Sequence, residues 1–172
     1  AGMMRRISAE GRRFIELEEG RVPIVYQDSA GYGTIGIGHK LTQSELSSGK
    51  IRLRSGVYID TRRGPITDEE INLIFAQDVS RFEVALNEAI VPESLLSLTP
   101  RQFDSLVSWA FNVGAGAARG STLVKRLNAG DFHAVPDELR KWNKAGGRVV
   151  KGLANRRARE AVRFAEDLDA SG

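Results

Sequence analysis

The sequence predicts an α+β fold, in which a small lobe with β-hairpins and a larger helical lobe lie on either side of a cleft. Between residues 23 and 64 apolar residues alternate with polar ones around turn-forming segments, and beyond residue 66 they recur at helical spacing. A chain of 172 residues suits one domain with two small lobes. We therefore expect a single domain over residues 1–172, with an N-terminal helix and β-containing lobe at 8–64, a connecting helix at 65–90 and a helical lobe at 91–172.

The N-terminal part predicts one helix and two hairpins. Ser8 is a favourable helix N-cap, and Gly20 is a typical residue after a helix end. Strand-like residues then flank the turn-forming segment 28–31, which predicts a first hairpin over 24–37. Alternating apolar residues at 51–53 and 57–59 flank a second turn and predict a second hairpin.

The remaining chain predicts helices, which begin at recognisable caps. Thr67 with Glu70 and Thr99 with Gln102 form the capping-box pattern. We expect a loop of small residues at 114–120 and further helices at 121–130 and 137–142, and we expect Asn155 to cap a last helix from 156 to about 168. The residues predicted to lie in the core of the helical lobe are large and apolar, namely Phe103, Leu106, Val107, Trp109 and Trp142.

Composition excludes several kinds of site. There is no cysteine, so disulfides and thiolate chemistry are excluded, and two histidines are too few for a typical multi-histidine metal site. We expect no metal and no cofactor. No segment approaches the ~18 apolar residues of a membrane span, and no signal peptide is visible. We expect His39 to serve structure by pairing with a carboxylate.

Positive charge is concentrated near the C-terminus. The net charge is +3, and residues 140–163 hold nine basic residues and one acid, Glu160. The pattern is typical of a solvated helix face, and equally of a surface that attracts an anionic polymer, anionic lipid or nucleic acid. The basic residues are Arg140, Lys141, Lys144, Arg148, Lys151, Arg156, Arg157, Arg159 and Arg163.

Glu19, Asp28 and Thr34 combine side chains that glycoside hydrolysis requires. One carboxylic acid must protonate the leaving oxygen, and one carboxylate must activate water or attack the anomeric carbon. Glu19 suits the acid, since the negative end of a helix disfavours the ionised form, although a nearby arginine would favour it. Asp28, in a solvated turn, suits the carboxylate, and Thr34 offers a hydroxyl to hold water. Spacing alone leaves the neighbouring acids Glu16 and Glu18 as alternatives.

Longer motifs around these residues resemble a known family. Three segments, Glu19-Gly20, Tyr26-Gln27-Asp28 and the run from Gly31 to His39, are similar to the N-terminal signature of the phage-type lysozymes, glycoside hydrolase family 24. That signature is a Glu, eight residues, an Asp or Cys, five residues and a Thr. The resemblance extends over roughly residues 8–165. Further matching segments are 102–114, 120–123, 127–130, 142–147 and 152–157.

The resemblance implies a lysozyme-like fold and an endolysin that cuts the β-1,4 bond between N-acetylmuramic acid and N-acetylglucosamine in peptidoglycan. Glu19 resembles the general acid, Asp28 the base that directs water and Thr34 the residue that positions this water, in an inverting mechanism whose carboxyl groups stand roughly 6.5–9.5 Å apart. Arg156 resembles an arginine that pairs with the catalytic Glu, with Arg157 as an adjacent candidate. The residues that resemble substrate-binding positions are Phe111, Asn112, Thr122 and Lys40.

Two rival functions follow from the same sequence. A lytic transglycosylase would use one acid/base Glu and give anhydro products, and it would not need Asp28 or Thr34. A non-catalytic module for cell wall or nucleic acid is suggested by the basic stretch, but no nucleic-acid-binding motif accompanies it. We expect a monomer that acts on peptidoglycan strands without specific nucleic acid, that is made in the host cytoplasm and works on the wall in the periplasm, with an envelope contact through its basic residues.

Overall fold

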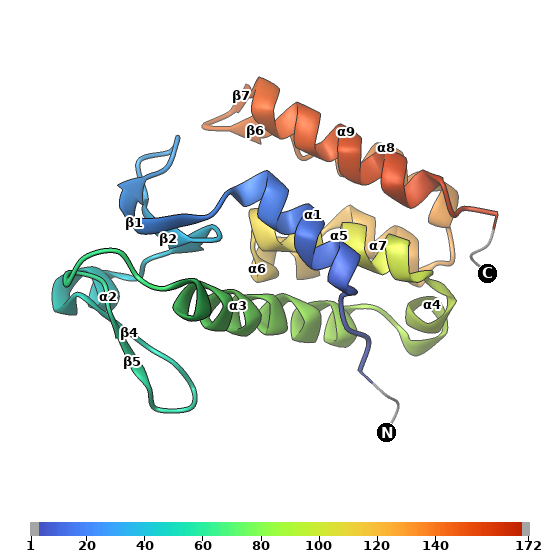
Figure 1. Ribbon diagram of the computed structural model, residues 1–172. Coiled ribbons are helices and arrows are strands. Elements are labelled where there is room, and N and C mark those ends of the chain that lie inside the picture. The colour runs from blue at the N-terminus through green and yellow to red at the C-terminus, as the bar shows by residue number, and fades with distance from the viewer. Residues whose placement is uncertain (1–3, 170–172) are drawn as a thin grey trace. The chain divides into compact units, whose positions relative to one another are not determined.

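The computed structural model describes residues 4–169. They form two compact units, one of residues 15–80 and one of the described residues of 1–14 and 81–172. The boundaries between the units fall inside helices α1 (Ala9–Glu19) and α3 (Asp68–Ala89). Helices predominate and the sheets are small and antiparallel (Figure 1), so the predicted α+β class is confirmed.

The unit of residues 15–80 is built around two small antiparallel sheets. Both predicted hairpins are confirmed: β1 pairs with β2, and β4 pairs with β5. A third strand extends the first sheet, which has the order β1-β2-β3. The elements are β1 (Val22–Gln27), β2 (Gly33–Gly36), β3 (His39–Lys40), α2 (Gln43–Ser48), β4 (Lys50–Arg52) and β5 (Tyr58–Asp60).

Isoleucines form much of the core of this unit. In β4 the alternation is direct, because Ile51 is buried while Lys50 and Arg52 are exposed, as a half-buried strand requires. β-branched side chains suit this pleated surface, since their restricted rotamers lose little entropy on packing. The isoleucines with at most 1% of their surface exposed are Ile15, Ile35, Ile37, Ile51, Ile59, Ile71 and Ile74.

Helix α2 was not predicted, although its start carries a clear signal. The Thr42 hydroxyl accepts a hydrogen bond from the Glu45 N–H, and the Glu45 carboxylate accepts one from the Thr42 N–H. Together they form the same capping box as the one predicted and confirmed at Thr67 and Glu70. The helix has only six residues and buries none of them, so apolar periodicity could not indicate it.

The second unit is mainly helical. Its elements are α4 (Pro92–Ser97), α5 (Pro100–Val113), α6 (Ala115–Arg119), α7 (Thr122–Asn128), the 3-10 helix η1 (Phe132–Ala134), α8 (Val135–Arg140), β6 (Lys144–Ala145), β7 (Arg148–Val149) and α9 (Lys151–Ala165). Helix α9 packs against both α5 and α8, with the β6–β7 hairpin at its N-terminal end (Figure 1). None of the helices within residues 4–169 combines the length and apolarity of a membrane span.

The core of the helical unit follows the predicted stripe of α5. Phe103, Leu106, Val107 and Trp109 are all fully buried, which confirms them as core residues. Trp142 is only half-buried and packs edge-on against Trp109, with ring centroids 5.6 Å apart. The stripe therefore holds α5 against its neighbours through large apolar side chains, each of which removes substantial surface from water.

Two predictions in this unit were wrong. The last helix begins at Lys151, not after Asn155, because the Val150 N–H closes the β6–β7 hairpin on the Asn143 carbonyl and the chain turns into the helix at once. The segment 114–120 is not all loop, since it contains α6, where three alanines, the best helix formers, outweigh Gly116 within the helix.

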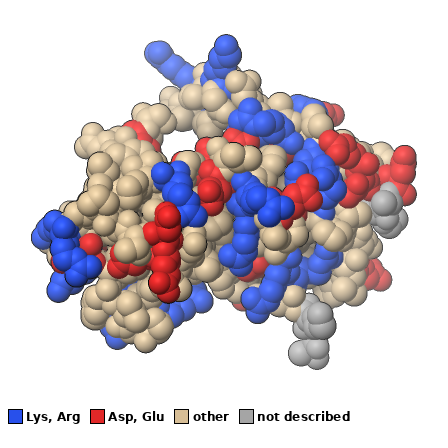
Figure 2. All heavy atoms as spheres, viewed as in Figure 1, with Lys and Arg blue, Asp and Glu red and all other residues tan. Residues whose placement is uncertain are grey.

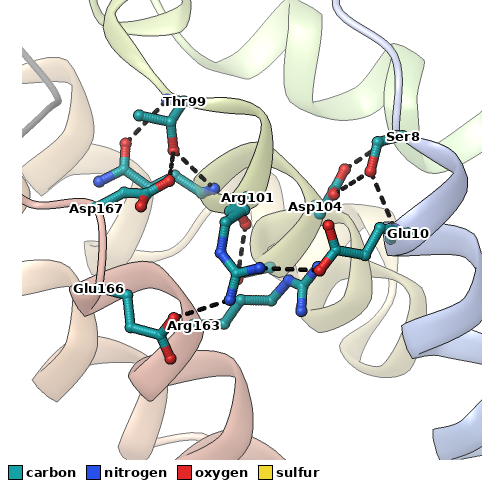
Figure 3. Close-up of polar contacts among 11 residues, drawn as sticks. Ser8, Glu10, Thr99, Arg101, Asp104, Arg163, Glu166 and Asp167 are labelled. Atoms are coloured by element: carbon teal, nitrogen blue, oxygen red, sulfur yellow. Dashed lines mark hydrogen bonds and ion pairs between the residues drawn. The ribbon is translucent and has the colours of Figure 1, made fainter.

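The start of α1 is fastened to the helical unit by polar contacts (Figure 3). The Ser8 hydroxyl caps α1 by accepting from the Gly11 N–H, and it donates to the Asp104 carboxylate, which also accepts from the Ser8 N–H. Glu10 forms ion pairs with Arg101 and Arg163, both at 2.8 Å. The predicted Ser8 cap is thus confirmed, and one end of α1 is held by charge as well as by packing.

Candidate active site

Glu19 is the last residue of α1, and its carboxylate lies against Gly38. The Gly20 N–H ends the helix by bonding to the Glu16 carbonyl at 2.8 Å. A Cβ atom built on Gly38 would lie 2.5 Å from Glu19 Oε1, and the backbone φ of Gly38 is +63°, which L side chains rarely adopt. The turn between β2 and β3 therefore requires glycine at position 38 for two reasons: the backbone has a positive φ, and a side chain would overlap the Glu19 carboxylate.

Asp28 follows directly on β1 and shapes the first turn. Its Oδ1 accepts hydrogen bonds from the N–H groups of Ala30 and Tyr32, both at 2.9 Å. Its own N–H bonds to the Tyr32 carbonyl at 2.9 Å, so the ladder of β1 and β2 continues to Asp28. Both side-chain bonds end on Oδ1, which leaves Oδ2 to act on another group.

Thr34 lies on β2 and is 2% exposed. Its hydroxyl donates to the Tyr32 carbonyl at 2.8 Å. A hydroxyl has one hydrogen and two lone pairs, so with its hydrogen used in this way Thr34 can hold a further group only by accepting from it. A water molecule that donated to Thr34 would keep its own lone pairs for other contacts, as a nucleophilic water must.

Tyr26 is a residue near these carboxylates that the sequence analysis did not single out. It lies on β1 opposite Thr34 and is half-buried. Burial raises the pKa of its phenol, and the negative charges of Glu19 and Asp28 raise it further. The Tyr26-Gln27-Asp28 motif was visible in the sequence, but only the paired strands show which residue it places beside the acids.

Lys40 is exposed on β3, where it follows the buried His39. Its ammonium lies 5.2 Å from the centre of the Tyr32 ring, a distance typical of a cation–π contact. Tyr32 is 60% exposed and stands in the turn between Asp28 and Thr34. Lys40 therefore belongs to the same unit as Glu19, Asp28 and Thr34, and its role in sugar binding stays a prediction.

Arg156 belongs to the helical unit, where it lies in a buried charged cluster with Arg157, Glu160 and Ser108. The Glu160 carboxylate is 3.3 Å from Arg156 Nε and 2.6 Å from Arg157 Nε, and it accepts a hydrogen bond of 2.5 Å from the Ser108 hydroxyl. Arg156 also donates to the Ser108 carbonyl at 3.1 Å. Burial raises the pKa of Glu160, and the two guanidinium groups oppose this.

The other predicted substrate-binding residues also belong to the helical unit. Phe111 is half-buried near the end of α5 and packs on Phe82, with ring centroids 5.2 Å apart. Asn112 follows it and is half-buried, and Thr122 is the exposed first residue of α7. The contacts within this unit do not test their role. A hollow between α4 and the segment 128–133 is lined by none of the predicted site residues.

His39 lies between two acids, which confirms the expected pairing with a carboxylate. Its Nδ1 is 2.7 Å from Asp78 on α3, and its Nε2 is 2.9 Å from Glu45 on α2. Desolvation of the buried ring lowers its pKa, but the hydrogen bonds and charges of Asp78 and Glu45 outweigh burial and raise the pKa to about 9. The imidazole is therefore a buried cation that ties β3 to two helices.

The basic stretch at 140–163 does not form one uniform positive face. Arg156 and Arg157 are buried beside Glu160, and Arg163 pairs with Glu10. Arg140 and Lys141 pair with acids on α8. Within residues 4–169, the cations of this stretch that are exposed and have no acidic partner are Lys144, Arg148 and Lys151, which lie on the β6–β7 hairpin and at the start of α9.

A mixed α+β chain that holds two carboxylates and a buried threonine hydroxyl in one unit has the kinds of side chain that a glycoside hydrolase uses. Comparison with known proteins agrees. The Phage lysozyme family model matches residues 16–160, and the chain belongs to this family.

Individual relatives show how far the similarity extends. The chain is 32% identical over 164 residues to the endolysin of Salmonella phage P22, covering 94% of this chain and 99% of that one. It is 40% identical over 99 residues to the endolysin of Bacillus phage B103, of which it spans 36%. Among solved structures, the endolysin of Escherichia coli O157:H7 phage FAHEc1 matches with a TM-score of 0.74 and 32% identity over 98% of both chains.

Proposed function

We propose that this chain is an endolysin with muramidase activity, which hydrolyses the β-1,4 bond between N-acetylmuramic acid and N-acetylglucosamine in peptidoglycan. The observation that carries the proposal is the position of Glu19, whose carboxylate is lodged against Gly38 in the same unit as Asp28 and Thr34. The proposal is supported by membership of the phage lysozyme family and by relatives that are named endolysins.

In the proposed mechanism Glu19 protonates the glycosidic oxygen of the leaving sugar. It stands at the C-terminal end of helix α1. The absence of a side chain at 38 leaves room for this carboxyl group. General acid catalysis of this kind contributes roughly 10²–10⁴-fold to the rate.

Asp28 and Thr34 orient the attacking water in this mechanism. The water donates one hydrogen to Asp28 Oδ2 and the other to Thr34 Oγ1, since the hydrogen of that hydroxyl is used by the Tyr32 carbonyl. Its lone pair is then free to attack the anomeric carbon, while Asp28 removes a proton. Attack by water on the face opposite the leaving group inverts the anomeric configuration.

The remaining predicted residues have supporting roles in this proposal. Arg156, held by Glu160 and Ser108, supports Glu19 and stabilises its carboxylate after proton transfer. The sugar contacts are assigned to Lys40, Phe111, Asn112 and Thr122. The protein acts as a monomer without metal or cofactor, because two carboxylates and a water molecule suffice for the reaction.

The decisive experiment is clearing of outer-membrane-permeabilised Gram-negative cells by wild-type protein, Glu19→Gln and Asp28→Asn. Both variants keep the shape of the side chain and remove its acid–base chemistry, and we expect each to lose at least 100-fold in rate. The matched controls are Glu18→Gln and Asp60→Asn, which should clear cells as the wild type does. Full activity of Glu19→Gln would falsify the assignment.

Product analysis separates hydrolysis from the rival reactions. Mass spectrometry of digested wall should show reducing muramic acid ends, whereas a lytic transglycosylase would give anhydro ends that are lighter by one water. Proton NMR of fresh products should show the α-anomer, the inverted configuration. Binding to wall or nucleic acid without any product would indicate a non-catalytic module instead.

The proposed setting is host cell lysis: synthesis in the host cytoplasm and action on the wall in the periplasm. Attraction to the anionic envelope is assigned to Lys144, Arg148 and Lys151. Basic side chains project at the top of Figure 2, where Figure 1 places β6 and β7. Changing all three to Glu should weaken cell-wall binding at low salt and remove most of its salt dependence, and unchanged binding would refute this role.

A further inference from the structure

Tyr26 shares one face of the first sheet with the proposed catalytic residues. Its Cα pairs with that of Thr34 across β1 and β2, and directly paired residues place their side chains on the same face. Asp28 follows two residues later, and its N–H continues the ladder. Because side chains alternate along a strand, positions 26 and 28 are expected on the same side.

Electrostatics supports the same placement. The pKa of the Tyr26 phenol is raised first by burial and then by the charges of Glu19 and Asp28. Both carboxylates therefore act on this hydroxyl, although they come from different elements of the unit. Because its pKa is raised above the ordinary value, the phenol stays protonated at neutral pH and so remains a hydrogen-bond donor.

The proposed centre is rich in acceptors and poor in donors. Asp28 accepts two hydrogen bonds through Oδ1, and the Thr34 hydroxyl uses its hydrogen on the Tyr32 carbonyl. The Tyr26 hydroxyl makes no hydrogen bond to any residue between 4 and 169. A half-buried donor without a protein partner, on the face that carries two acids, has its hydrogen to offer to a bound molecule.

We infer that Tyr26 is a further substrate-contacting residue, whose phenol donates a hydrogen bond to a hydroxyl or acetamido oxygen of the sugar at the bond that is cut. The inference rests on the proposed function and deepens it. A sugar presents such oxygens around its ring, and a donor beside the acid and the base fixes the ring relative to both. The neutral phenol suits this role, since a cation there would bind the two carboxylates instead.

The first test measures the placement without using activity. Carbon-13 NMR of labelled tyrosine follows the ionisation of each phenol separately, and the Tyr26 signal is assigned by its loss in Tyr26→Phe. We expect Glu19→Gln and Asp28→Asn each to lower the pKa of Tyr26, whereas Asp60→Asn should leave it unchanged. If the pKa of Tyr26 is the same in wild type, Glu19→Gln and Asp28→Asn, the inference is overturned.

The second test measures the contact with substrate. Tyr26→Phe removes one oxygen and keeps the ring, so folding should persist, and kcat/KM on purified peptidoglycan should fall about tenfold, the effect of one hydrogen bond. Tyr58→Phe on β5 is the matched control and should keep wild-type kcat/KM. Wild-type kcat/KM in a folded Tyr26→Phe protein would refute the contact.

The proposed function and the role of Tyr26 are contradicted by different results. If Glu19→Gln keeps its activity, the proposed function is wrong whatever Tyr26 does. If Glu19→Gln is inactive while Tyr26→Phe has wild-type kinetics, the proposed function stands and the role of Tyr26 is refuted. If Glu19→Gln and Tyr26→Phe both lose activity while Tyr58→Phe keeps it, the proposed function and the role of Tyr26 are both supported.

Discussion

The buried histidine predicts a specific dependence of stability on pH. His39 lies between Asp78 and Glu45, which raise its pKa from 6.5 to about 9. Each pKa unit corresponds to about 1.4 kcal/mol, so protonated His39 contributes about 3 kcal/mol to the free energy of unfolding. Because the folded-state pKa is the higher one, the contribution is complete below pH 6.5 and disappears as the pH rises through about 9.

The measurement is urea-induced unfolding of wild type, His39→Gln and His133→Gln at pH 6 and pH 10. His39→Gln should be less stable than wild type by about 3 kcal/mol more at pH 6 than at pH 10, because the wild type alone loses the charged imidazole between them. His133, exposed on η1, is the matched control and should follow the wild type at both pH values. A constant difference between wild type and His39→Gln at the two pH values would refute the reasoning.

Two further substitutions test the contacts of the site and of the charged cluster. Gly38→Ala should lower wall-clearing activity at least tenfold, because the new methyl group would overlap the Glu19 carboxyl group. Gly56→Ala is the control: Gly56 also has a positive φ but has open space around it, so this variant should keep its activity. Equal losses of activity in the two variants would contradict the steric explanation. Glu160→Gln should lower the free energy of unfolding by about 3–5 kcal/mol, since it removes the buried carboxylate that faces two buried guanidinium groups. Chemical denaturation that gave a loss under 1 kcal/mol would show that the cluster is not held by this carboxylate.

Much of the fold was predictable because its signals are local. Capping boxes at Thr67 and Thr99 and the turn at 28–31 depend on a few neighbouring residues, and each lies where it was expected. The start of α9 was not predicted correctly, because it depends on a hydrogen bond to a residue outside the helix. The Val150 N–H donates to the Asn143 carbonyl, and the helix begins at the next residue. The burial of Arg156 and Arg157 was missed for a similar reason, since their partner Glu160 counted as one acid in a basic stretch.

The candidate site divides in the same way. Glu19, Asp28 and Thr34 were assigned from family resemblance, since spacing alone left other acids open, and their catalytic roles stay a prediction. The expected pairing of His39 with a carboxylate is confirmed. Two features needed the structure. The space that Gly38 leaves for Glu19 and the position of Tyr26 opposite Thr34 both depend on strand register, which a sequence does not display.

The different contacts of the two Asp28 oxygens affect how substitutions at this position are interpreted. Oδ1 holds the turn through the N–H groups of Ala30 and Tyr32, and Oδ2 is the atom to which we assign the contact with water in the proposed mechanism. Asp28→Asn would preserve the turn and remove the proposed base, whereas Asp28→Ala would remove both. Alanine scanning would therefore attribute to catalysis a loss of activity that is caused partly by loss of the turn.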